Sequence, residues 1–188
     1  MIIYTDIVSG DEIVADTFKL VPNKQFDVLW ECDCRKYLKR GNEDFQLEGA
    51  NPSAEEGGDD EGGDGEAVMV HDIEDQFRLQ WLKVEDGAKP SKESYKEHIK
   101  SYIKKLHKNA VPALREGKTT EEADEAEKEW KKKIAGAMKM ILANWDNYDV
   151  LMGQSMDGDA MHVLIDFRED GVTPYATVWA DGLKPIKV

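Results

Sequence analysis

The most constraining feature of the sequence is a pair of amphipathic segments between residues 91 and 147. In the first segment, apolar side chains recur at spacings of 4, 3, 1 and 3, as on one face of a helix: Tyr95, Ile99, Tyr102, Ile103 and Leu106. Pro90-Ser91 predicts the start of this helix, and Pro112 and Gly117 predict its end.

The second segment begins near Thr119, because Thr119 and Glu122 fit a capping box in which hydroxyl and carboxylate satisfy free amides. Acidic residues fill its first turn and lysines follow, as the helix dipole favours. Its apolar stripe consists of Ala123, Ala126, Trp130, Ile134, Ala137, Met138, Ile141, Leu142 and Trp145. Two stripes joined by a short polar link predict an α-helical hairpin over residues 91–147, packed on a further layer.

Segments typical of β-strands lie on both sides of this hairpin. They cover residues 2–8, 13–20, 26–30 and 68–84 before it, and 148–153, 160–168 and 174–180 after it. Turn residues separate the last segments, at Glu169-Asp170-Gly171 and Asp181-Gly182. The predicted fold class is α+β, with a mainly antiparallel sheet, an inserted helical hairpin and one domain over residues 1–188.

Residues 48–66 differ from the rest, with eight acidic residues, six glycines and no basic residue. Such a segment repels itself and has little to bury, so we expect a long mobile loop. Carboxylates suit Ca²⁺, and the candidate ligands for a weak calcium site are Glu55, Glu56, Asp59, Asp60, Glu61 and Asp64. The alternative is a solvated tether with a diffuse cloud of counterions. We expect no tightly bound cofactor.

The formal net charge of −14 argues against nucleic acid and anionic membranes as partners, since both need clustered Lys and Arg. Much of this acidity is local, because residues 48–66 carry −8 of it. The start of the chain lacks the features of a signal peptide, and no stretch approaches the roughly 20 apolar residues of a membrane span. We therefore expect a cytoplasmic protein without membrane insertion.

One basic feature stands against this acidity, on the outer faces of the first predicted helix. It consists of Lys92, Lys96, Lys100, Lys104, Lys105 and Lys108, against only Glu93 and Glu97. A solvated face would explain this pattern without any partner. The same face would also meet an acidic partner such as a tubulin tail.

Motifs that carry chemistry are scarce. The sequence has no P-loop, dinucleotide-binding glycine motif, nucleophile elbow or His-Glu-x-x-His, so we predict that the protein is not an enzyme. Cys32 and Cys34 would supply half of a zinc site, but ordinary strand placement also explains their spacing. The histidines show no ligand spacing and are expected at the surface or its boundary: His71, His98, His107 and His162. An unrecognised hydrolase or metalloenzyme is a further, less favoured hypothesis.

Several blocks of the sequence occur together, in order, in one known family. They are Met1-Ile2-Ile3-Tyr4 with Asp6 and Asp11-Glu12, then Gly49 to Glu55, Ser94 to Tyr102, Ile141 to Trp145, and Phe167 to Tyr175. Over nearly its whole length the chain therefore resembles the translationally controlled tumour protein family, also called fortilin or histamine-releasing factor.

The resemblance implies a β-tent sheet with a projecting helical hairpin, similar to a Rab-binding chaperone fold, in a cytosolic protein without a catalytic site. It also implies calcium binding, association with tubulin and stabilisation of microtubules, and contact with translation elongation factors. A link to growth signalling through Ras-like small GTPases and an anti-apoptotic role are implied as well. The lysine-rich hairpin is the region that the family links to tubulin and calcium, which here means Lys92, Lys96, Lys100, Lys104 and Lys105.

The GTPase contact of the family falls on Asp11 and Glu12. The alternative function is guanine-nucleotide exchange or chaperone-type activity on a small GTPase, using Glu12. Three positions depart from the family pattern: Gln154 replaces a glutamate, Gln46 replaces a phosphorylated serine, and Val188 replaces a cysteine used for disulfide dimers. We therefore expect a monomer.

Overall fold

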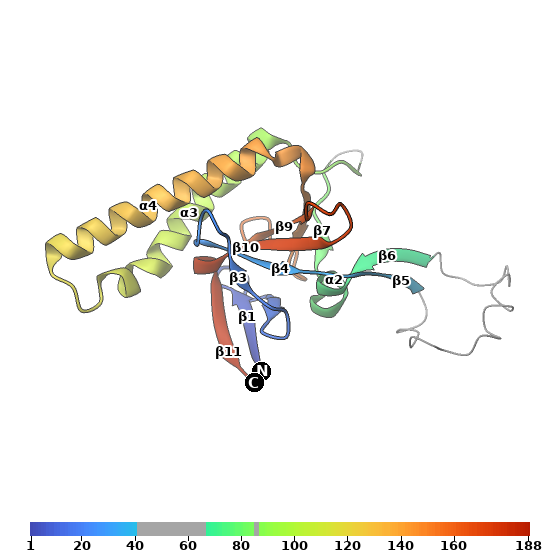
Figure 1. Ribbon diagram of the computed structural model, residues 1–188, viewed down its shortest axis with the longest axis horizontal. Coiled ribbons are helices and arrows are strands. Elements are labelled where there is room, and N and C mark those ends of the chain that lie inside the picture. Colours follow the sequence, from blue (N-terminus) through green and yellow to red (C-terminus); the bar gives the residue numbers. More distant parts are fainter. Residues whose placement is uncertain (41–66, 85–86) are drawn as a thin grey trace, which may run out of the picture.

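The structure is a computed structural model that describes residues 1–40, 67–84 and 87–188. Every strand pair in this part of the chain is antiparallel. A three-stranded sheet has the order β11 (Leu183–Lys187), β1 (Ile2–Asp6) and β2 (Glu12–Ala15). The two termini meet at one end of the paired strands β1 and β11, where Val188 N donates to Met1 O at 2.9 Å (Figure 1).

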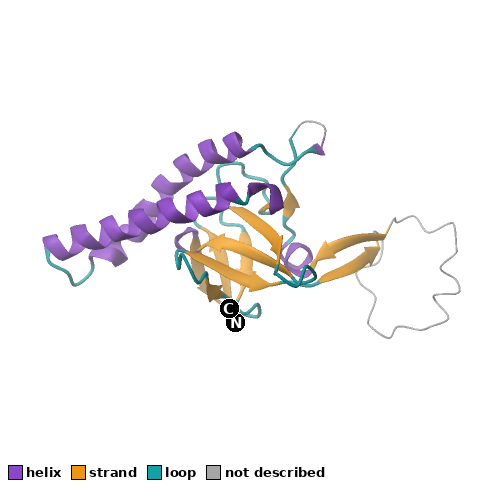
Figure 2. Cartoon of the chain, turned by 45° about the horizontal axis from the view of Figure 1, so that its top comes forward, coloured by secondary structure: helices purple, strands orange, loops and turns teal. Residues whose placement is uncertain are grey.

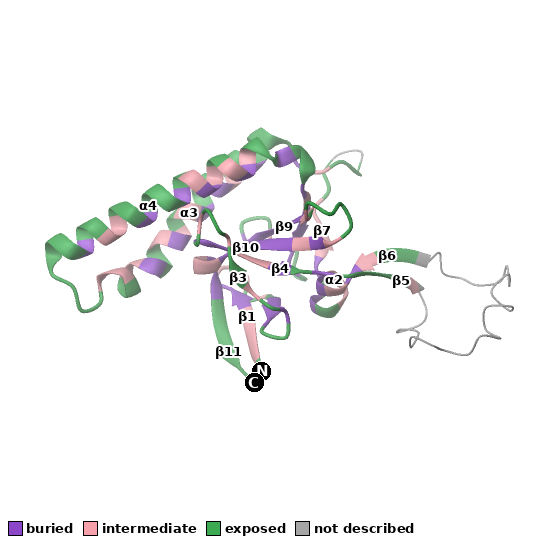
Figure 3. Cartoon of the chain, in the orientation of Figure 1, coloured by how far each residue is buried: buried purple, intermediate pink, exposed green. Residues whose placement is uncertain are grey.

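The second sheet has six strands and contains most of the core. Its order is β3 (Val21–Pro22), β4 (Leu29–Asp33), β10 (Pro174–Trp179), β9 (His162–Phe167), β8 (Asp149–Met152) and β7 (Gln80–Trp81). The central strands are nearly continuous runs of buried residues, since both of their faces are covered. Figure 3 shows much of these strands in the colour of buried residues. Leu151, Leu164 and Trp179 are among the fully buried side chains there.

A two-stranded ribbon of β5 (Lys36–Arg40) and β6 (Ala67–His71) extends β4 away from the body (Figure 2). The short helix α2 (Asp72–Phe77) follows β6. Sequence pattern had predicted strand across residues 68–84, and this prediction is wrong for α2. The local signals are Glu74, whose Oε1 accepts from His71 N at 3.2 Å, and an acidic first turn, while Ile73 and Phe77 face the core one turn apart.

The helical hairpin consists of α3 (Lys92–Arg115) and α4 (Thr120–Ala143), inserted between β7 and β8. Ser91 and Thr119 cap the two helices, each accepting a backbone N–H three residues on. The end of α3 lies between the two predicted stop residues: the helix continues through Pro112, because a proline in the last turn removes only one helical bond, and ends at Arg115, just before Gly117. The short helices η3 (Trp145–Asn147) and η4 (Ala180–Gly182) connect to the sheets.

The predicted α+β class, with antiparallel sheets and an inserted helical hairpin, is confirmed. Several strand boundaries were wrong: β1 ends at Asp6, β2 ends at Ala15, and β4 runs from Leu29 to Asp33. The strands β5 and β11 were not predicted. After β2 the chain turns, with Phe18 N donating to Ala15 O, so Phe18 reaches the core without belonging to a strand. The predicted acidic loop, residues 48–66, lies outside the described residues. No helix in the described part is long and apolar enough to cross a membrane.

Candidate functional site

The turn between β1 and β2 is fixed from inside the protein by Asp6. This carboxylate is 2% exposed and accepts hydrogen bonds from Val8 N at 2.9 Å and Met161 N at 2.7 Å. Burial raises its pKa, against the opposing effect of these two bonds. Its backbone N–H donates to Asp11 O at 2.9 Å, which closes the turn.

Asp11 and Glu12, the predicted GTPase contacts, differ in their surroundings. Asp11 Oδ2 accepts from Ser155 Oγ at 2.6 Å and Ser155 N at 3.2 Å. Gly153 lies so close that a Cβ there would be 2.4 Å from Asp11 Oδ2. Glu12 is exposed at the start of β2, and no described residue forms a hydrogen bond or ion pair with its side chain. Asp11 therefore fastens the turn, while Glu12 is available to a partner.

Two histidines join the hairpin to the six-stranded sheet beside this turn. The rings of His98 (α3) and His162 (β9) stack with centroids 3.8 Å apart and an interplanar angle of 10°. Desolvation lowers the pKa of His98 to about 4 and that of His162 to about 3. Both imidazoles are therefore neutral at pH 7, and they pack against Tyr95 and Tyr102.

The predicted placement of the histidines at the surface or its boundary is wrong for His71 and His162, which are 1% and 5% exposed. The spacing of histidines along the sequence indicates possible metal ligands but not packing, so this role was not predicted. The available signal was the position of His162 in the run Met161 to Ile165, whose other members are all apolar and buried.

The hairpin is held to η4 by polar contacts as well as by apolar packing. Trp130 Nε1 of α4 donates to Asp181 Oδ2 at 2.7 Å, and Asn109 Nδ2 of α3 donates to Asp181 O at 2.8 Å. Burial raises the pKa of Asp181 and the bond from Trp130 lowers it. Gly182 packs beneath α3, where a Cβ would lie 2.3 Å from Tyr102 Oη. These contacts fix where the hairpin leaves the sheets.

The lysines predicted for partner binding lie on α3, but not all on one face. Lys92, Lys96, Lys100 and Lys104 are exposed at four-residue intervals, whereas Lys105 is half-buried. With 100° between successive residues, Lys105 lies on another side from Lys100. Its charge helps to lower the pKa of His98, after the larger effect of desolvation.

These lysines lack acidic neighbours close enough to pair with. Within the described residues, no carboxylate oxygen lies within 4.0 Å of their Nζ atoms, whereas Arg115 pairs with Asp124 and Glu127, and Lys133 with Asp27. We name the exposed row Lys92, Lys96, Lys100 and Lys104 the lysine row. It presents positive charge along the first half of α3 and turns by about 120° around the helix axis between Lys92 and Lys104.

The predicted metal ligands are of two kinds. The six calcium candidates, Glu55, Glu56, Asp59, Asp60, Glu61 and Asp64, lie outside the described residues. In the described part, no group of three His, Cys, Asp or Glu side chains is placed to hold a metal ion. Cys32 and Cys34 are both buried on one face of the β4 strand region. The pKa of Cys34 is raised, first by the neighbouring Cys32 thiol and then by burial.

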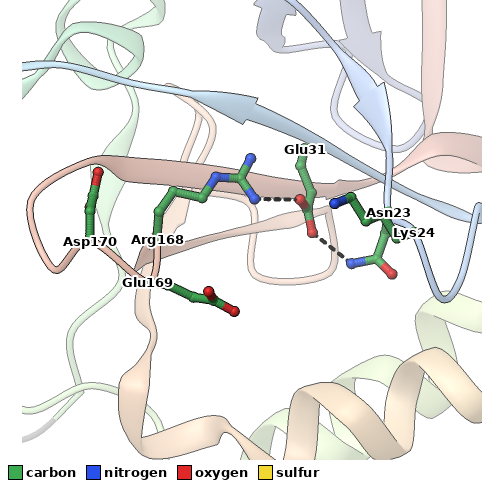
Figure 4. A pocket seen from close by; sticks show the side chains of 6 residues that line it. All are labelled: Asn23, Lys24, Glu31, Arg168, Glu169 and Asp170. Carbon is green, nitrogen blue, oxygen red and sulfur yellow. Dashed lines mark hydrogen bonds and ion pairs between the residues drawn. The ribbon is translucent and has the colours of Figure 1, made fainter.

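Arg168, beyond the end of β9, was not predicted as a functional residue. Its Nη1 lies 2.8 Å from Glu31 Oε1 and its Nε 2.8 Å from Asp33 Oδ1, and its guanidinium carbon is 4.0 Å from the Tyr175 ring centroid. Asn23 Nδ2 donates to Glu31 Oε2 at 2.6 Å, across a shallow hollow of about 480 Å³ (Figure 4). Since these groups satisfy one another, the cluster joins strands rather than offering free ligands.

Comparison with known proteins agrees with this architecture. A model of the family described as translationally controlled tumour protein matches residues 1–184. Proteins named translationally-controlled tumor protein homolog are 66% identical in Aspergillus fumigatus, over 100% of both chains, and 35% identical in Schizosaccharomyces pombe, over 97% of both.

Solved structures are similar over the same length. The translationally controlled tumor-associated protein p23fyp from Schizosaccharomyces pombe has a TM-score of 0.70 at 34% identity and covers 100% of both chains. The NMR structure of the translationally-controlled tumor protein from Caenorhabditis elegans has a TM-score of 0.63 at 26% identity, covering 100% of this chain and 99% of that one. The chain therefore belongs to the translationally controlled tumour protein family.

Proposed function

We propose that the chain is a non-catalytic cytoplasmic interaction protein whose lysine row binds acidic surfaces of tubulin and microtubules. One observation carries the proposal. Between Glu97 and Glu116, α3 contains no acidic side chain. It contains five lysine or arginine side chains: Lys100, Lys104, Lys105, Lys108 and Arg115. Of these five, only Arg115 is paired with a carboxylate within the described residues.

The geometry suits an extended acidic partner. Side chains four residues apart on a helix are separated by about 6 Å along the axis, so the row spans about 18 Å from Lys92 to Lys104. The four lysines are exposed on the half of α3 that packs on the sheets, while the tip of the hairpin extends beyond the sheets (Figure 1). Exposed lysines retain much of their hydration, so the contact would be salt-sensitive and would favour fast association.

The test is co-sedimentation with microtubules of the wild type and a Lys96→Gln, Lys100→Gln, Lys104→Gln variant. Glutamine keeps helix propensity close to that of lysine, so α3 should remain folded. We expect about tenfold weaker binding, since three attractive charges are lost. A Lys83→Gln, Lys184→Gln, Lys187→Gln variant loses the same charge at exposed positions away from α3 and should bind like the wild type. Equal binding by all three proteins would reject the lysine row as the site.

A second proposal concerns a Ras-like small GTPase in growth signalling, with Glu12 as the contact residue. The observation that favours it is the contrast within one turn: Ser155 holds the Asp11 carboxylate, whereas the Glu12 carboxylate is exposed and unpaired among the described residues. A rigidly placed free carboxylate suits contact with a GTPase. It also suits disturbance of the Mg²⁺ site, as nucleotide exchange would require.

The GTPase proposal is tested by the rate of nucleotide release from a Ras-like GTPase, with a pull-down as the binding readout. Glu12→Ala should abolish binding, while Asp16→Ala, at an exposed position just after β2, should not. Binding lost with an unchanged release rate would mean chaperone-type contact without exchange. Binding by Glu12→Ala equal to that of the wild type would exclude Glu12 as the contact.

Weak calcium binding by the acidic run and contact with translation elongation factors belong to the same proposal. Family membership and the carboxylate density of residues 55–64 support calcium. Calorimetric titration of the full chain with Ca²⁺ should give a weak heat signal that disappears when residues 55–66 are deleted. An undiminished signal in the deletion variant would place calcium elsewhere.

A further inference from the structure

The ribbon of β5 and β6 has an open edge. β5 pairs with β6 along one side, and no other described strand pairs with it. Four apolar side chains of the ribbon are largely exposed: Tyr37 36%, Leu38 54%, Val68 56% and Met69 52%. Unpaired backbone groups beside exposed apolar side chains can accept a further strand.

The hydrogen bonds around Arg35 show which edge is open. Cys34 N donates to Pro174 O, toward β10, whereas Arg35 N donates to Asp72 Oδ1 and Asp72 N donates back to Arg35 O. Successive residues of a strand direct their backbone groups to alternate sides, so β6 lies on the side of β5 opposite β10. The open edge of β5 therefore continues the line of β10, beyond Pro174.

A hollow of about 930 Å³ adjoins the start of this edge. Its lining includes Lys19, Arg35, Lys36 and Val172, which is 75% exposed. Asp33 and Asp72 also line the hollow, but Arg168 pairs with Asp33, and Asp72 Oδ1 accepts hydrogen bonds from Arg35 N and Ile73 N. In the described part of the chain, no carboxylate lies within 4.0 Å of the charged nitrogens of the three basic side chains. The edge and the hollow together offer positive charge next to apolar surface.

This composition selects among possible occupants. In a second copy of the chain, antiparallel pairing of this edge centred on Tyr37 would place Arg35 opposite Lys39, and like charges there are unfavourable. The chain's own acidic run, residues 55–66, has matching charge but contains only Glu, Asp and Gly, so it has nothing to cover the apolar side chains.

We propose that the open edge of β5 binds an extended acidic peptide segment of another protein as an added strand. Its side chains would follow the pattern acidic, apolar, apolar, acidic, opposite Lys36, Tyr37, Leu38 and Lys39. Side chains of directly opposite residues are neighbours in a sheet, so each position meets its complement. The pattern reads the same in both directions, and acidic residues beyond it would reach Arg35 and Lys19. Lys39, which already pairs with Asp75, would be shared.

The test uses the full chain and a fluorescent twelve-residue peptide containing Glu-Glu-Val-Val-Glu-Glu, with binding followed by anisotropy. An Arg35→Gln, Lys36→Gln variant should bind about tenfold more weakly, because two charge-assisted contacts are lost. Lys184→Gln, Lys187→Gln, which removes two exposed charges on β11, should bind like the wild type. A peptide N-methylated at alternate amides should bind about tenfold more weakly, since it cannot complete the ladder on β5.

Several outcomes would overturn the proposal. Equal affinity of the wild type and the Arg35→Gln, Lys36→Gln variant for the peptide would show that the basic residues of this edge do not bind it. Equal affinity of the wild type for the methylated and unmethylated peptides would show that the peptide does not bind as an added strand. Deletion of residues 55–66 should leave the affinity unchanged, and a large increase would identify that acidic run as the occupant. A dimer that dissociates when peptide is added would identify a second copy as the occupant.

Discussion

The turn that carries Glu12 requires that Gly153 has no side chain. A Cβ at this position would lie 2.4 Å from Asp11 Oδ2 and 2.7 Å from Asp11 Cβ, so alanine must displace the turn. We expect Gly153→Ala to lower the free energy of unfolding by about 1–3 kcal/mol, as overpacking usually does. Urea denaturation measures this difference.

Gly158 provides the matched control, because it lies in the same loop with open space where its Cβ would be. Gly158→Ala should leave stability unchanged within about 0.5 kcal/mol, the usual range for surface substitutions. Equal midpoints for the two variants would show that Asp11 is not held by this contact.

The neutral His98 and His162 pair predicts a loss of stability in mild acid. The folded-state pKa values, about 4 and about 3, lie below the ordinary value of 6.5. Between pH 6.5 and 4 the unfolded chain therefore binds more protons than the folded one. The stabilisation is complete above about pH 6.5 and is lost as pH falls, by at most about 1.4 kcal/mol per pH unit for His162.

The measurement is urea denaturation at several values between pH 6.5 and 5, above the range in which ordinary carboxylates titrate. His162→Phe keeps an aromatic ring in the stack but removes one titrating group, so its stability should depend less steeply on pH. The same slope in both proteins would mean that His162 is not excluded from protonation in the folded state.

At the scale of elements, the hairpin depends on its anchor at η4. Trp130→Phe removes the donor to Asp181 and leaves a half-buried carboxylate without that bond. We expect a loss of about 1–3 kcal/mol, the usual effect of an unsatisfied buried acceptor. Amide hydrogen exchange should show faster opening in α4.

Trp81→Phe is the control for this prediction. Trp81 Nε1 also donates to a carboxylate, Glu74 Oε2 at 2.7 Å, but it lies on β7, away from the hairpin. This variant should leave the exchange rates of α4 unchanged. Faster exchange of α4 in both variants would indicate global destabilisation rather than a local anchor.

The helices could be predicted from sequence because each carries its own caps and a long apolar stripe. α2 was missed because its six residues contain only two apolar positions, and these also fit a strand pattern. The lysine row followed from helical spacing, whereas the inward position of His162 did not, since it depends on contact between α3 and β9. The fixing of Asp11 by Ser155 joins residues 144 positions apart, which no local pattern reveals.

At the scale of the whole molecule, acidic and basic residues are segregated into different segments of the chain. The chain has a net charge of −14, yet the lysine row of α3 forms no ion pair with any described residue. Binding of the lysine row to an acidic partner must therefore act at short range, against repulsion from the rest of the chain. Affinity for tubulin should fall steeply with salt, because the screening length shortens from about 30 Å at 0.01 M to about 10 Å at 0.1 M.

The most direct test of the lysine row compares intact microtubules with microtubules whose acidic tubulin tails have been removed by limited proteolysis. If the row binds those tails, the wild type should lose about tenfold in affinity on trimmed microtubules, the effect of a few exposed charge contacts. The Lys96→Gln, Lys100→Gln, Lys104→Gln variant should bind both forms equally weakly. Undiminished binding of the wild type to trimmed microtubules would contradict the account.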